Sequence, residues 1–154
     1  MILKQIALIH RKLLNLIFPK RCFGCRRAGT YLCSNCLAKI DRADLTETAS
    51  GIHTVFNYHD PVLKKAIWQL KYRGAKEIAE VFGQAIYDQL IEELAELKMW
   101  QGRPAKILVL PVPLAPAKMR ARGFNQSALI AKAFVKKDLG NFVIEENNLR
   151  KIKN

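Results

Sequence analysis

The residues with the most specific chemistry are the four cysteines, which form two C-x-x-C pairs. Cys22 pairs with Cys25 and Cys33 with Cys36, and seven residues lie between the pairs. Two thiolates at this spacing can turn onto one ion at the tip of a backbone knuckle. Two knuckles then complete a tetrahedral four-sulfur site that suits Zn²⁺. Because four thiolates leave no open position, the spacing predicts a structural zinc site with a short hairpin between the knuckles.

Two other uses of these cysteines are weaker alternatives. Disulfide bonds need an oxidising compartment, and residues 1–18 lack the small-residue cleavage site of a signal peptide. A redox-active C-x-x-C pair would leave the second pair without a purpose. The favoured interpretation is therefore a zinc-binding protein of the cytoplasm.

The second chemical feature is the loop at 111–126, PVPLAPAKMRARGFNQ. It joins an apolar run at 107–112, expected to be a strand, to a helical pattern at 126–135. A helix N-terminus that follows a strand and a glycine-containing loop presents backbone N–H groups to an anion. Lys118, Arg120 and Arg122 add positive charge there. The pattern predicts a phosphate site in an α/β sheet, and an exposed basic loop without a ligand is the alternative.

The charge of the whole chain agrees with a polyanionic partner. The 154 residues include 26 Lys and Arg against 13 Asp and Glu, which gives a formal net charge of +13. Such a balance favours nucleic acid, phosphorylated metabolites or an acidic membrane surface. No apolar run reaches the roughly 20 residues of a membrane span, so no transmembrane segment is predicted.

The segment 1–18 has the spacing of an amphipathic helix, with apolar residues at steps of three and four. It is expected to pack on the protein's own core or on a partner, and docking on a membrane surface is the alternative. Residues 19–45 form the cysteine module, and a polar linker follows. Residues 51–154 are expected to form the α/β domain.

Several elements are expected to position the basic residues. Residues 52–59 alternate like a strand, and Asp60 and Pro61 have the types that begin a helix. Helices are expected at 62–72 and from 76 to about 98. Trp68 and Tyr72 lie near the basic cluster. They are expected to pack in the core or an interface, and stacking on nucleic-acid bases is the alternative.

The order of these motifs resembles the ComF family of competence proteins. It consists of the cysteine module, then L-K-Y-R-G at 70–74, P-V-P-L at 111–114 and R-A-R-G-F-N-Q at 120–126. The resemblance covers the chain from about residue 14 onward. It implies an α/β domain similar to type I phosphoribosyltransferases, with a zinc finger in front, in a cytoplasmic factor of natural transformation.

The resemblance also implies ligands and site residues. Phosphoribosyl pyrophosphate, assisted by Mg²⁺ in the full-length family, would bind the loop after the first core strand. Single-stranded DNA and other competence proteins would be the macromolecular partners. The pyrophosphate or anion positions would be Arg120, Arg122, Gly123, Phe124, Asn125 and Gln126. Further basic positions, for the same site or for a DNA backbone, would be Lys71, Arg73, Gly74 and Lys118.

One departure from the family pattern changes the functional expectation. A later strand that ends in paired acidic residues followed by Thr and Gly is missing. The chain therefore resembles the front two-thirds of a family member, with an incomplete phosphoribosyltransferase-like core and no catalysis of its own. The alternatives are a transferase completed by a second chain and a zinc-dependent adaptor that binds nucleic acid or docks to another protein.

Overall fold

The structure, a computed structural model, describes residues 19–42, 53–101 and 106–151. The helix expected at 1–18 lies outside the described residues, as does most of the linker. The elements in chain order are α2 (Ser34–Ala38), α3 (Pro61–Tyr72), α4 (Glu77–Gln101), β1 (Ile107–Val109), α5 (Pro116–Arg122), α6 (Gln126–Val135) and β2 (Phe142–Ile144).

The two strands form a small parallel sheet. Ile107 lies opposite Phe142, and Val109 lies opposite Ile144. Parallel neighbours need a crossover connection, and here α5 and α6 provide it. The strand expected at 107–112 is present but ends at Val109. Pro111 beyond it has no backbone N–H to donate to a ladder.

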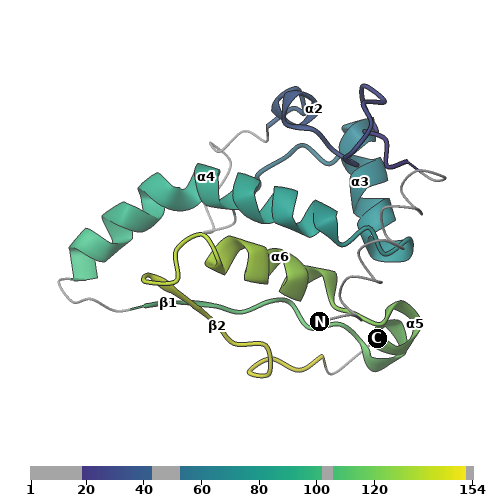
Figure 1. The fold of residues 1–154 in the computed structure, drawn as a ribbon. Helices are drawn as coiled ribbons and strands as arrows, with labels where there is room; N and C mark the ends of the chain where they lie inside the picture. Colours follow the sequence, from purple (N-terminus) through teal and green to yellow (C-terminus); the bar gives the residue numbers. More distant parts are fainter. Residues whose placement is uncertain (1–18, 43–52, 102–105, 152–154) are drawn as a thin grey trace, which may run out of the picture.

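Helix α6 lies between the sheet and the long helix α4 (Figure 1). Its end is fixed by an aromatic cluster in which the rings of Phe134 and Phe142 are 4.8 Å apart and Tyr87 meets both edge-on. Gly83 permits the close contact between the helices, since a Cβ there would lie 2.5 Å from the Cβ of Ala133. The sheet, α6 and α4 therefore form three successive layers, with both helices on the same side of the sheet.

A second core joins the cysteine module to α3 and the start of α4. Leu32 and Ile40 from the module are buried together with Leu63, Leu70 and residues of α4. In Figure 1 the module lies above α3 and the near end of α4. Folding of the module and placement of α3 therefore share one set of buried side chains.

Helix α3 begins and ends as the sequence predicted. The side chain of Asp60 accepts a hydrogen bond from the Leu63 N–H at 2.9 Å, and Pro61 occupies the first turn. Arg73 is the C-cap, and Gly74 follows with φ of 69°. A positive φ favours glycine at this stop. Helix α4 begins at Glu77 and runs to Gln101, three residues beyond the expected end.

The strand expected at 52–59 is wrong for the part of it that the structure describes. Only an isolated bridge forms there, between Phe56 and Arg42. The chain turns at once, because the Asn57 side chain accepts from the His59 N–H and its carbonyl accepts from the Asp60 N–H. Strand-like alternation is therefore interrupted by the turn that leads into the cap of α3.

The structure also places a helix inside the segment expected to be a loop. Helix α5 has seven residues, begins with Pro116 and ends at Arg122, and its C-cap Gly123 is in the left-handed conformation. On the far side of the sheet, Leu108 and Val143 are partly exposed, at 47% and 38%. Among the described helices, none has the length and apolar character needed to cross a membrane.

Candidate functional site

The four cysteines form one compact cluster. Their sulfur atoms all lie within 4.8 Å of one another, and the Cys33 Sγ is 3.6 Å from both the Cys22 Sγ and the Cys25 Sγ. Four sulfurs bound tetrahedrally at 2.3 Å from a zinc ion would be about 3.8 Å apart. The donor set and its spacing thus fit a zinc-sized metal ion, and the cluster could hold one.

The backbone around the cluster favours thiolate at one of these positions. Burial alone would raise the pKa of Cys22, but N–H groups of Cys33, Cys25 and Gly24 hydrogen-bond its sulfur and lower the pKa to about 6. A hydrogen bond with Cys33, reinforced by burial, raises the pKa of Cys36 to about 12. Opposite shifts in neighbouring thiols are expected when negative charge concentrates on the buried member of a cluster.

Tight packing keeps the two knuckles together. A Cβ at Gly24 would lie 2.7 Å from the Cys36 Sγ, so the first knuckle can approach the second only with glycine. The Phe23 ring stacks on Tyr31 at 5.6 Å, and the Arg21 and Ala28 backbones pair as in a hairpin. This bridge encloses the first knuckle, whereas the sequence predicted a short hairpin between the two knuckles.

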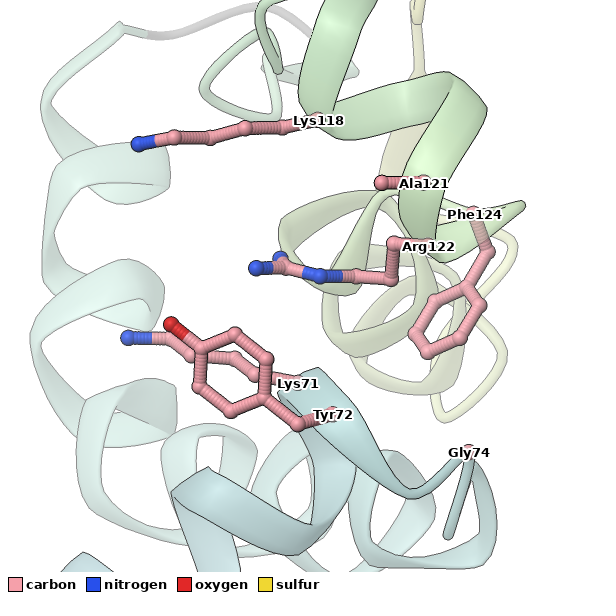
Figure 2. A pocket seen from close by; sticks show the side chains of 7 residues that line it. All are labelled: Lys71, Tyr72, Gly74, Lys118, Ala121, Arg122 and Phe124. Carbon is pink, nitrogen blue, oxygen red and sulfur yellow. The ribbon is translucent and has the colours of Figure 1, made fainter.

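The second candidate site is a pocket between the end of α3 and helix α5. Its volume is about 240 Å³. Lys71 comes from α3, whereas Lys118 and Arg122 come from α5 (Figure 2). Figure 2 shows the three charged ends extending toward the same side of the pocket. The complete lining is Lys71, Tyr72, Gly74, Lys118, Ala121, Arg122 and Phe124.

Electrostatics of the pocket favour an anion. No acidic side chain is among its lining residues, so the positive charges are not neutralised within it. The Arg122 guanidinium lies over the Tyr72 ring at 5.4 Å and donates to the Gln126 side chain across the turn between α5 and α6. Lys76 lies 4.7 Å from the centre of the Phe124 ring. These contacts orient the cations rather than neutralise them.

Several other residues of the R-A-R-G-F-N-Q motif fix the turn between α5 and α6 next to the pocket. Gly123 ends α5 in the left-handed conformation. Asn125 caps α6 by accepting from the Ser127 N–H, and its amide donates to the Val112 carbonyl at 3.0 Å. Gln126 holds Arg122, and Arg120 is exposed outside the lining. The motif thus divides into pocket-lining and loop-holding residues.

The L-K-Y-R-G motif at 70–74 also contains both residues that line the pocket and residues that do not. Lys71 and Gly74 line the pocket, but Arg73 points elsewhere and lies 5.3 Å from the centre of the Trp68 ring. The sequence did not identify Ala121 as a lining residue, and no motif marks it. Tyr72 was considered only for core packing or base stacking, and its place in the pocket depends on how α3 meets α5.

Trp68 and Tyr72 were expected to pack in the core or in an interface, and the core part of that expectation is wrong. Tyr72 is 64% exposed and Trp68 is 43% exposed. Helix α3 buries Leu63, Ala66 and Leu70 on its opposite face, and these smaller side chains fill the core. Exposed aromatic side chains beside lysines and arginines remain available to a ligand.

Comparison with models of known protein families, with characterised proteins and with solved structures gives no match for this chain.

Proposed function

We propose that this chain is a ComF-like competence factor, in which a zinc-stabilised module supports a phosphate-binding domain used in the handling of single-stranded DNA. The motif order supports the family assignment. A parallel strand–helix–strand unit with a basic segment between its first strand and helix α6 supports the similarity to type I phosphoribosyltransferases.

The observation on which this proposal rests is the convergence of two basic motifs on one pocket. Lys71 is 47 positions from Lys118 (118 − 71), yet both line the same cavity with Arg122. The fold therefore brings together two basic motifs that lie far apart in the chain. A phosphate or pyrophosphate group is the ligand that three unneutralised cations recognise best.

The chemistry of the pocket suits a pyrophosphate group more than a catalytic step. Fixed cations stabilise the charge that pyrophosphate gathers, with little reorganisation. No carboxylate lines the pocket, so the described residues do not fit a protein-held Mg²⁺ there, and the phosphate ligand would have to bring the ion. We therefore place binding, rather than phosphoribosyl transfer, at the centre of the proposal.

Calorimetry with pyrophosphate and with phosphoribosyl pyrophosphate, each with Mg²⁺, tests this function. Substituting Lys118→Ala or Arg122→Ala removes a charge-assisted contact and is expected to weaken binding roughly ten-fold or more. The control is Lys136→Ala, which removes the same charge from an exposed position at the end of α6. Equal affinity in the pocket variants and the control would refute the pocket as the anion site.

A transferase assay separates the enzymatic alternative from binding. The chain alone is expected to release no pyrophosphate from phosphoribosyl pyrophosphate in the presence of candidate base acceptors. Clear turnover that Arg122→Ala abolishes would replace the binding proposal with an active transferase. Zinc is the metal we propose for the cysteine cluster, and metal analysis of the purified protein is expected to give one Zn²⁺ per chain.

A further inference from the structure

Helix α3 has an exposed face of alternating aromatic and basic side chains, which we name the α3 stripe. Its members are Lys64, Lys65, Trp68 and Tyr72 within the helix, Tyr58 just before it and Arg73 at its C-cap. Lys65, Trp68 and Tyr72 recur at steps of three and four, and Lys64 lies beside them, so these four share one side of the helix, opposite the buried Leu63 and Leu70. The face is therefore a continuous surface that the core does not use.

The aromatic rings of the stripe are accessible and held in place. Tyr58 is 59% exposed, and the Trp68 and Tyr72 rings are 5.9 Å apart with a tilt of 48°. Lys64 lies 5.8 Å from the centre of the Tyr58 ring, and Arg73 lies over Trp68. Each ring thus has a cation beside it and a face or edge open to solvent. Rings with adjacent cations are the usual platform for unpaired bases and their phosphates.

The stripe leads into the anion pocket. A groove of about 450 Å³ lies along it and is lined by Tyr58, Lys64, Lys65, Trp68 and other residues of α3. Lys71 and Tyr72 line both this groove and the anion pocket. A chain molecule that follows the groove would therefore reach the pocket at the end of α3.

We infer that the α3 stripe binds a single-stranded nucleic acid by base stacking, and that the anion pocket receives the phosphate at one end of that strand. This inference rests on the proposed function, because it uses the same pocket. A terminal phosphomonoester has a larger negative charge than an internal diester, and the three cations of the pocket match it. The Trp68 and Tyr72 rings, one turn apart along α3, provide stacking sites for neighbouring bases, whereas a duplex keeps its bases stacked internally.

Fluorescence anisotropy with an oligothymidylate of about ten nucleotides tests the stripe, since single-strand binders cover sites of that size. Trp68→Leu is expected to weaken binding roughly ten-fold because it removes the stacking ring and keeps apolar bulk. Trp68→Phe keeps a ring and should recover much of the affinity. Leu139→Ala truncates a side chain that is 66% exposed outside the stripe and should leave binding unchanged.

Salt dependence separates stacking from phosphate contact. For a single strand, loss of one phosphate contact lowers the slope of log affinity against log salt by about 0.7. Lys64→Ala is expected to lower that slope, whereas Trp68→Leu is expected to lower affinity at an unchanged slope. Binding that depends on Lys64 but not on Trp68 would overturn the stacking interpretation and leave nonspecific charge attraction.

The terminal phosphate is tested by comparing the same oligonucleotide with a phosphate at its 5′ end, at its 3′ end, or at neither end. One end-phosphorylated form should bind wild-type protein about ten-fold more tightly than the unphosphorylated form. Arg122→Ala should abolish that difference while stacking persists. If pyrophosphate binds the pocket but end phosphorylation has no effect, this inference fails and the proposed function stands. If pyrophosphate does not bind at all, the proposed function fails independently of the stripe.

Discussion

The cysteine module and the anion pocket differ in how far their parts lie from one another along the chain. All four cysteines come from residues 22–36, and their sulfur atoms lie within 4.8 Å of one another. The pocket draws its lining from residues 71–124, at the end of α3, which packs on α4, and on α5, which a short turn joins to α6. One site is therefore assembled by local turns, and the other by the fold.

The two sites should therefore respond differently to substitutions. The module contributes Leu32 and Ile40 to the core that positions α3, whereas the pocket residues Lys118 and Arg122 lie on or near the surface. Loss of the cysteine cluster should therefore disturb the pocket, but loss of the pocket should not disturb the cysteine cluster. The coupling between the sites is expected to run mainly in one direction.

The largest effect is expected from Cys33→Ser. It removes a sulfur central to the cluster, and structural zinc sites contribute about 10 kcal/mol or more to the folding of small modules. Metal analysis should show zinc falling from about one ion per chain toward zero, and thermal unfolding should shift to much lower temperature. Pyrophosphate affinity should also fall, because α3 loses the buried side chains on which it packs.

Two controls make that result specific. Ser34→Ala changes an exposed residue of the same module and should keep both zinc and the unfolding temperature. Arg122→Ala should keep zinc while it weakens pyrophosphate binding. Zinc loss on Arg122→Ala would contradict one-way coupling, and a folded Cys33→Ser protein of unchanged stability would contradict a structural metal.

The contrast between local and long-range assembly also explains which features the sequence could predict. Features that neighbouring residues determine were predicted. They are the clustering of the four cysteines, the helix start at Asp60 and Pro61, and the helix at 126–135. β2 was not predicted, since a three-residue strand exists only through its pairing with β1. The signal for α5 was present, with proline in the first turn and glycine just past the end, but its short length and high charge resemble a loop.

The pocket itself could be predicted only in part. The two motifs supplied its cations, but nothing in the sequence indicated that Arg73 would turn to Trp68 and Arg120 to solvent. For α3, the direction in which each side chain points decides the outcome. Leu70 is buried in the core, and this orientation of the helix places Lys71 and Tyr72 in the pocket beside α5. Which cation of a motif reaches a ligand depends on packing that the motif does not encode.

A smaller effect is expected from Gly83→Ala, which tests the fold-dependent site alone. Alanine is normally the better helix residue by about 1 kcal/mol. Here its Cβ would lie 2.5 Å from the Cβ of Ala133 and 2.7 Å from the backbone N of Phe134. We expect a net loss of about 1–2 kcal/mol in urea unfolding, because overpacking costs more than the gain in propensity. Pyrophosphate binding should weaken while zinc content stays constant.

The neighbouring substitution Gln84→Ala provides the matched control. It changes a half-buried residue of the same helix and is expected to alter stability by less than about 0.5 kcal/mol. A more stable Gly83→Ala protein would show that α4 and α6 do not approach as closely as the structure indicates. The pocket would then not depend on that contact.

The smallest effect is expected from Asn125, which holds the loop behind the pocket in two ways. Its side-chain oxygen accepts from the Ser127 N–H at 3.0 Å as the cap of α6, and its amide donates to the Val112 carbonyl at 3.0 Å. Asn125→Ala removes both contacts and should cost about 1 kcal/mol. Because the Ser127 hydroxyl also donates to that carbonyl at 3.2 Å, part of the link to Val112 should survive.

Asn125→Asp separates the cap from the tether, because aspartate caps a helix well but cannot donate to the Val112 carbonyl. If the cap dominates, urea unfolding of the aspartate variant should match that of the wild type. If the tether dominates, the aspartate variant should be as unstable as the alanine variant. In either case the added carboxylate should weaken pyrophosphate binding through repulsion near the pocket, and Asn125→Ser, an uncharged cap, distinguishes that repulsion from loop movement. Unchanged pyrophosphate affinity in all three variants would show that the cations of α3 and α5 hold their positions without this loop.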